Sequence, residues 1–361
     1  MSLRRFFPCL FAVCSLGCGN NTDAPPPSYG AMLVTVGEQV ILPAHREFVK
    51  HADDLVSALQ ALEQSPDPKS LVAAQAAWRA ARKAFRVLDA VQLVPDVNLR
   101  IADRIDVAPA DNAGIEALVA GRGAVDDAAV SNAGGKKKGF LGLEYLLFPD
   151  PAATDPAPVL ADDGADARRR TLALSMGDEI AASARKLDDT WELDKVGYIA
   201  EFEHPSLGAR RYFSELDALN DLIGGGAFAL ENIVGVRLAR PLGRRNGGTP
   251  DPSQDPTSRS DNAVADMQSS LEGFVAVYSL PAFAEQVKLH SSALDQRVNA
   301  EIGSSQASLA AIPTPFAAAV VDQTPMVQAA YDANQALKHT WDSDVTLALG
   351  ATYRVGEIDG D

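Results

Sequence analysis

Apolar residues recur along most of the chain at intervals of three and four, the spacing of one face of an α-helix. No segment alternates strictly between apolar and polar residues for long, so the pattern predicts an all-α protein. Pro43 is expected to kink or restart the first helix, and Gly224 to Gly226 are expected to end another. The predicted helices cover residues 34–63, 70–91, 113–119, 165–191, 206–223, 227–238, 262–278, 282–310 and 316–349.

One further segment, residues 138–148, is nearly all apolar but carries a single carboxylate, Glu144. On a helix, Leu141, Tyr145 and Phe148 share its face. A carboxylate desolvated there without a partner would cost several kcal/mol, so the fold must supply a cation, hydrogen-bond donors, a metal or a proton. We therefore expect Glu144 to be buried and to form an ion pair with an arginine.

Arg82 is the candidate for that ion pair. It shares a helix face with Trp78 and Phe85 at positions i−4 and i+3, so a cation is set among aromatic rings. The alternative is that the stem of Arg82 lies along the protein surface. Asp106 is a second candidate carboxylate, with a helix cap or a turn as the alternative role.

The N-terminus reads as an export signal. Arg4 and Arg5 precede an apolar run over residues 6–16, and the run is too short to span a bilayer. The sequence then resembles a lipobox that ends in Cys18, which predicts a signal peptide over residues 1–17 and a lipid on Cys18. An ordinary secretory peptide is the alternative. All three cysteines lie in this leader, so the rest of the chain has no disulfide framework.

Length and composition extend this picture. Residues 18–32 are polar and rich in proline, which predicts a disordered tether. The remainder of the 361 residues suffices for two domains, here predicted as helical bundles over 33–195 and 196–361. A net charge of −16 excludes a nucleic-acid partner, since a phosphate backbone requires a basic surface.

Three segments resemble the imelysin family, a group of bacterial cell-envelope proteins linked to iron uptake and formerly classed as metallopeptidases. The family motif Gly-x-His-x-x-Glu is matched at Gly139 and Glu144, but Leu141 occupies the histidine position. Residues 78–85 resemble the family's Trp-Arg-x-x-Arg stretch, and residues 104–109 resemble Arg-Ile-Asp-x-Trp-Pro. The resemblance implies two helical bundles with a cleft between them.

The resemblance also implies a site, and three hypotheses follow for its function. First, the protein is a binding module for iron or another metal, lipid-anchored in the cell envelope at the outer membrane or cell surface, and works with envelope metal-transport proteins. Second, it is a metallopeptidase. Third, it is an interaction scaffold that has lost its metal site. In the first, a polar pocket between the domains is lined by Glu144, Arg82, Asp106, Ser260 and Asn262, with Glu144 as a ligand for iron or a divalent metal.

Leu141 counts most against the peptidase hypothesis, because leucine neither ligates a metal nor transfers a proton. A catalytic zinc site normally needs three protein ligands, and no His-Glu-x-x-His sequence occurs. The chain also has no Gly-x-Ser-x-Gly sequence, so nothing supports a serine nucleophile. Among the five histidines, His45 is the most notable because it follows Pro43 in the expected kink.

Overall fold

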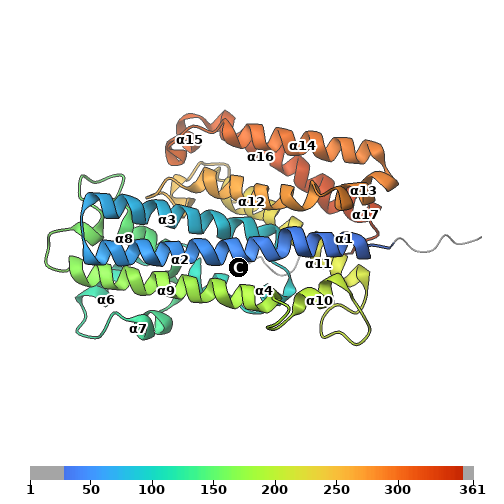
Figure 1. Ribbon diagram of the computed structural model, residues 1–361. Coiled ribbons are helices and arrows are strands. Elements are labelled where there is room, and N and C mark those ends of the chain that lie inside the picture. The colour runs from blue at the N-terminus through green and yellow to red at the C-terminus, as the bar shows by residue number, and fades with distance from the viewer. Residues whose placement is uncertain (1–27, 353–361) are drawn as a thin grey trace, which may run out of the picture.

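The computed structural model describes residues 28–352 as helices joined by loops, with no β-strand in that range (Figure 1). This confirms the all-α prediction. The predicted signal peptide, Cys18 and residues 353–361 lie outside the described residues. The tether was predicted to reach residue 32, but a helix already begins at Gly30. Tyr29 and Met32 are buried, so these positions belong to the folded part of the chain.

The first half of the chain contains three long helices and several short ones. In order, they are α1 (Gly30–Val36), the π-helix η1 (Gly37–Ile41), α2 (Leu42–Gln64), α3 (Pro68–Val87), the 3₁₀-helix η2 (Leu88–Val91), α4 (Val94–Val97), α5 (Ala102–Ile105), α6 (Asn112–Ala120), α7 (Asp127–Asn132), η3 (Gly135–Lys137), α8 (Gly139–Leu147), η4 (Pro158–Leu160) and α9 (Asp166–Trp191).

The second half is built in the same style. Its helices are α10 (Tyr198–Glu203), α11 (Glu215–Glu231), the π-helix η5 (Asn232–Leu238), η6 (Pro252–Gln254), α12 (Ala263–Tyr278), α13 (Pro281–His290), α14 (Ser292–Ala310), α15 (Phe316–Asp322), α16 (Thr324–His339), the π-helix η7 (Thr340–Val345) and α17 (Thr346–Ala348).

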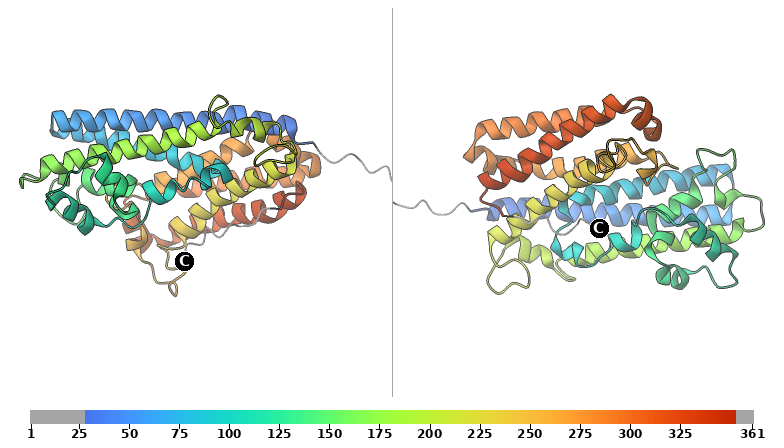
Figure 2. Two further views of the ribbon diagram at one scale, coloured as in Figure 1. Left: turned by 90° about the horizontal axis from the view of Figure 1, so that it is seen from below. Right: turned by 180° about the vertical axis from the view of Figure 1, so that it is seen from behind.

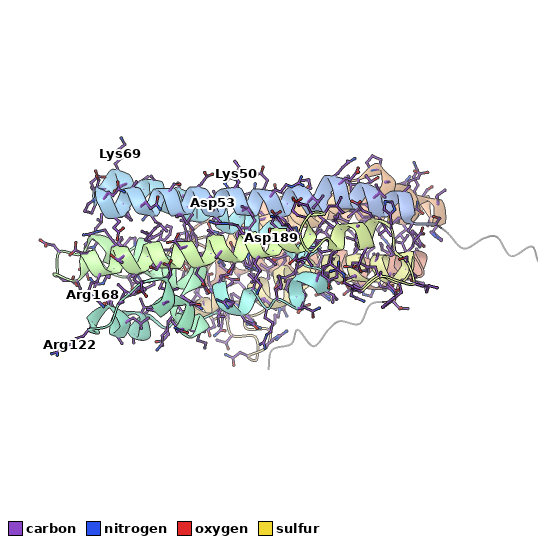
Figure 3. All side chains as sticks on the ribbon, turned by 60° about the horizontal axis from the view of Figure 1, so that its bottom comes forward. Lys50, Asp53, Lys69, Arg122, Arg168 and Asp189 are labelled. Atoms are coloured by element: carbon purple, nitrogen blue, oxygen red, sulfur yellow. The ribbon has the colours of Figure 1, made fainter. Side chains whose placement is uncertain are left out.

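The long helices lie side by side in a stack. Its order is α9, α2, α3, α12 and then the pair α14 and α16 (Figures 1 and 2). Charged side chains such as Lys50 and Asp53 on α2 and Asp189 on α9 cover the outer face of the stack (Figure 3). No helix of the described residues is both long and apolar enough to cross a membrane.

Local sequence explains how several helices begin. The predicted restart at Pro43 corresponds to the π-helix η1, after which Pro43 lies in the first turn of α2, where a missing N–H is tolerated. Asp67 and Ser70 form a capping box at the start of α3.

The prediction for residues 206–226 is wrong in two respects. Residues 205–214 are not helical, and α11 runs through Gly224 to Gly226 instead of ending there. These glycines allow close packing: a Cβ on Gly225 would lie 2.5 Å from the Ala90 carbonyl oxygen, and one on Gly226 would lie 2.6 Å from the Trp341 ring. Tertiary contact therefore overrides the usual role of glycine as a helix end.

The two halves pack closely against each other. On α12, Gly273 faces the backbone of Val87 at the end of α3, and α1 from the first half packs against α10, α11 and α13 of the second. Buried apolar residues of both halves form one continuous core. The division into two domains at residue 195 stays a prediction.

Candidate functional site

Glu144 lies on α8, a short helix that is buried along most of its length. The helix begins at Gly139, whose φ of +69° is a conformation that favours glycine. A Cβ there would lie 2.3 Å from the Ile105 carbonyl oxygen. Glycine is thus required at position 139 by the backbone angle and by the close approach of the Ile105 backbone. Because α8 begins at this glycine, the contact fixes the position of Glu144 on the helix.

The carboxylate of Glu144 is buried, as expected, but its partner is Ser260. The backbone N–H and the hydroxyl of Ser260 both donate to Glu144 Oε1, at 2.8 and 2.6 Å. Among residues 28–352, no cation lies within ion-pair distance of Glu144, and Oε2 accepts no hydrogen bond. The predicted ion pair with Arg82 is therefore wrong: two neutral donors replace it.

Burial governs the protonation of Glu144. Desolvation raises the pKa of its carboxyl to about 7, although the two hydrogen bonds from Ser260 oppose this. The charge of Arg82 also lowers the pKa of Glu144, and the charge of Asp255 raises it. Near neutral pH, Glu144 is thus divided between its charged and neutral forms.

Arg82 is buried too, and two aspartates hold it. Its Nε and Nη2 donate to Asp266, the latter to Oδ2 at 2.7 Å, and its Nη1 donates to Asp106 at 2.8 Å. The guanidinium also lies over the rings of Trp78 and Phe140. The alternative of a surface stem for Arg82 is excluded, and so is a mere turn role for Asp106.

These residues belong to a larger set that we call the buried charge cluster: Arg82, Arg86, Asp89, Asp106, Arg237 and Asp266. Within it Arg86 donates to Asp106 at 2.5 Å, and Arg237 lies 3.7 Å from Asp266. Burial alone would raise the pKa of Asp106, but Arg86 and Arg82 outweigh it and lower that pKa. The three arginines and three aspartates balance in charge.

The segment Ser260, Asp261 and Asn262 connects the cluster to two other parts of the fold. Ser260 binds Glu144 on α8, while the amide of Asn262 donates to Asp266 at 2.8 Å. Between them, Asp261 has a φ of +51° and accepts a hydrogen bond from the N–H of Phe316 on α15. The segment leads into α12, whose cap residue is Asn262 and makes no side-chain cap bond.

A narrow hollow lies beside this segment, lined by Arg237, Asp255, Pro256, Thr257 and Ala263. It does not admit a water-sized sphere in this conformation. Two buried polar atoms nearby, Arg237 Nε and Asp255 Oδ2, have no hydrogen-bond partner among the described residues. Such atoms are uncommon in proteins and call for an explanation.

The structure thus brings together all five predicted site residues, in two connected parts. Glu144 and Ser260 form one part, and Arg82, Asp106 and Asn262 join the cluster in the other. The prediction missed Arg86, Asp89, Arg237, Asp255 and Asp266. Asp266 and Ser270 are polar positions on a largely apolar helix, and that pattern could have indicated them; Ser270 donates to Asp89 at 2.6 Å.

The donor set does not fit a metal of the peptidase kind. Leu141 is buried at the histidine position of the motif. Over residues 28–352, no three histidine, cysteine or acidic side chains are grouped so that they could hold an ion. The aspartates of the cluster already pair with arginines. His45 is buried elsewhere, against Asp96.

Comparison with known proteins agrees with this architecture. The structure superposes on a putative iron-regulated protein A precursor from Parabacteroides distasonis with a TM-score of 0.73 and 20% sequence identity. The superposition covers 91% of this chain and 97% of that one. An imelysin-like protein from Psychrobacter arcticum superposes with a TM-score of 0.69 and 16% sequence identity. The superposition covers 91% of this chain and 96% of that one. These likenesses show the fold. No curated protein matches the chain.

The family itself is shown by sequence. The imelysin model, which carries the peptidase M75 label, matches residues 41–341, most of the chain. The chain belongs to the imelysin family.

Proposed function

We propose that this imelysin protein is a binding module of the cell envelope that takes up a metal cargo and does not hydrolyse peptides. The observation that carries the proposal is a pair of buried carboxylates, Glu144 and Asp255, close enough that the charge of Asp255 raises the pKa of Glu144. Among residues 28–352, each has one oxygen that accepts no hydrogen bond. Burial raises the pKa of both groups, so a cation between them would compensate both.

Two carboxylates are too few for a bare zinc ion, which normally takes three protein ligands and an open position. The cargo therefore has to bring ligands of its own, as a chelated ferric ion does. Because the hollow is narrow, the segment over residues 255–260 has to shift when the cargo enters. The name of the Parabacteroides distasonis relative, a putative iron-regulated protein, favours iron.

Anchoring is the second part of the proposal. A lipid on Cys18 would hold the protein at the outer membrane or the cell surface, beside envelope metal-transport proteins that deliver or receive the cargo. The support is the lipobox-like end of the leader and the confinement of all cysteines to it. Mass spectrometry of the N-terminal peptide from the membrane fraction tests it, since a lipid adds the mass of its acyl chains to Cys18.

The melting temperature of the protein with and without added metal tests the proposed cargo. Ferric citrate should raise the melting temperature of the wild type, while citrate alone and zinc chloride should not. Glu144→Gln and Asp255→Asn should each abolish the rise, and the exposed control Glu285→Gln should keep it. A rise with zinc alone, or one that survives Glu144→Gln, would contradict the proposed mode of binding.

An interaction scaffold without cargo is the second candidate. The charge balance of the buried charge cluster favours it, because the arginines and aspartates compensate one another without a ligand, and the hollow does not admit a water-sized sphere. Unchanged melting with every metal and chelate would support this candidate instead.

A further inference from the structure

The chain enters the folded region at one end of the stack, where α1 begins (Figure 1). The N–H of Tyr29 donates to Glu215 at 2.6 Å, and its hydroxyl donates to the carbonyl of Leu349 at 2.7 Å. These bonds fix the entry point between the start of α11 and the end of α17. Any anchor on Cys18 is therefore connected to this end of the molecule.

Large apolar side chains are exposed on segments at this end of the stack (Figure 1). They include Leu207, 91% exposed, Leu347, 81% exposed, Phe213, 48% exposed, and Leu216, 41% exposed. Phe213 and Leu216 flank Glu215 in sequence, and Leu347 is two residues from Leu349. We call these four residues the end patch. A single exposed leucine is ordinary, but several at the end of the molecule where the chain enters indicate a contact surface.

The most exposed member of the end patch lies on an ordered turn. The N–H of Ser206 donates to the carbonyl of Tyr212, and the N–H of Ala209 donates to that of Ser206. Tyr212 is fully buried, and its hydroxyl donates to Asp221 at 2.7 Å. The fold thus presents Leu207 to the outside on a supported loop.

The length of chain between Cys18 and the entry point limits how far this end can lie from a membrane. Eleven Cα-to-Cα steps separate Cys18 from Tyr29, which span at most about 40 Å when extended. An anchored molecule therefore keeps the end patch close to the bilayer.

We propose that the end patch rests on the lipid bilayer that holds Cys18, with Leu207 and Phe213 inserted among the headgroups. The inference rests on the lipid anchor proposed above. Leucine and phenylalanine are suited to the headgroup boundary, where their burial is favourable.

The charged residues near the end patch indicate which class of lipid headgroup it contacts. Glu201, Glu203, Glu215 and Asp217 lie close in sequence to the end patch. The two arginines there, Arg210 and Arg211, lie within ion-pair distance of Glu201 and Asp221. Net attraction to anionic lipid is therefore absent, so contact depends on apolar insertion. A zwitterionic bilayer is the expected partner, and added salt should change the contact little.

The experiment uses the full chain, lipidated on Cys18 and reconstituted into phosphatidylethanolamine and phosphatidylcholine vesicles. Because the chain has no cysteine after Cys18, Leu207→Cys introduces one thiol for a polarity-sensitive dye. The matched control is Val72→Cys, at an exposed residue near the start of α3. Lys69, three residues earlier on the same helix, lies at the end of the stack remote from the start of α1 (Figure 3).

Lipids with brominated acyl chains should quench the dye at position 207 at least twofold more than the dye at position 72, in low and high salt alike. Equal quenching at the two positions, with Cys18 shown to be lipidated, overturns the membrane contact and leaves the anchor intact. A chain without lipid on Cys18 overturns both. Energy transfer between dyes at position 207 on different copies, without quenching, would instead identify a dimer surface and overturn the proposal.

Discussion

His45 Nε2 lies 3.3 Å from Asp96 Oδ2, and both side chains are almost completely buried. The other ring nitrogen, Nδ1, donates to the carbonyl of Ile41 at 2.8 Å. Asp96 also accepts a hydrogen bond from Trp191 at 2.8 Å. Burial alone would lower the pKa of His45, but Asp96 outweighs it and raises that pKa above its ordinary value. Asp96 thus favours the protonated imidazole, and the pair joins α2 to α4.

His45→Gln should reduce the free energy of unfolding by about 3 kcal/mol at pH 6, because it leaves Asp96 buried without its cation. A pair with a raised histidine pKa contributes fully below the unfolded pKa of about 6.5 and is lost as the pH rises through the folded pKa. Urea unfolding at pH 6 and pH 9 should therefore show a smaller loss at pH 9. The exposed control His290→Gln should show no such dependence; an equal loss at both pH values would refute the charged pair.

Glu144→Gln, like His45→Gln, should become more stable relative to the wild type as the pH rises. The folded pKa of Glu144, about 7, is above its unfolded value, so the wild type loses stability between about pH 4.5 and pH 7 as the buried carboxyl ionises. Glutamine cannot ionise but can still accept from Ser260. From pH 5 to pH 8, the variant should gain up to about 3 kcal/mol relative to the wild type. A constant difference across this range would mean that the carboxyl is well solvated.

Arg82→Met should be severely destabilising. It leaves Asp266 and Asp106 buried with one cation fewer, and breaking a buried pair costs about 3 to 5 kcal/mol. The control is Arg185→Met, which removes a half-exposed pair with Asp53 and should cost less than about 1 kcal/mol. Chemical denaturation compares the two; similar losses would argue against a structural role for the buried charge cluster.

Gly273→Ala tests the close approach of α3 and α12. A Cβ there would lie 2.1 Å from the Val87 carbonyl oxygen, so the helices must move apart, at a cost of about 1 to 3 kcal/mol. Gly303 on α14 has open space around it, and Gly303→Ala should instead stabilise the protein by about 0.5 to 1 kcal/mol. Thermal unfolding of the two variants should shift the melting temperature in opposite directions.

Periodicity predicted those parts of the fold that local sequence determines. The helix expected over residues 165–191 appears as α9 (Asp166–Trp191), and the burial of Glu144 followed from its apolar neighbours. Periodicity failed where distant contacts decide. Gly225 looked like a helix end because the Ala90 backbone that it accommodates lies far away in sequence.

The partner of Arg82 shows the same limit. Asp266 is separated from it by 184 residues, so no local spacing relates the two. The apolar setting of Glu144 showed that compensation was needed, but not whether a cation or neutral donors would supply it. That choice depends on Ser260, which the fold brings to α8 from a loop 116 residues further on.

The pairing of Arg82 on α3 with Asp266 on α12 also fixes the register of the two halves. The guanidinium meets this carboxylate at one position along the α3–α12 crossing, and sliding by one helical turn would separate the two charges in an apolar surrounding. Apolar side chains alone would tolerate such a slip more readily, because their attraction is not directional. The ion pair thus favours one alignment of α3 against α12 during folding and makes alignments shifted by one turn less stable.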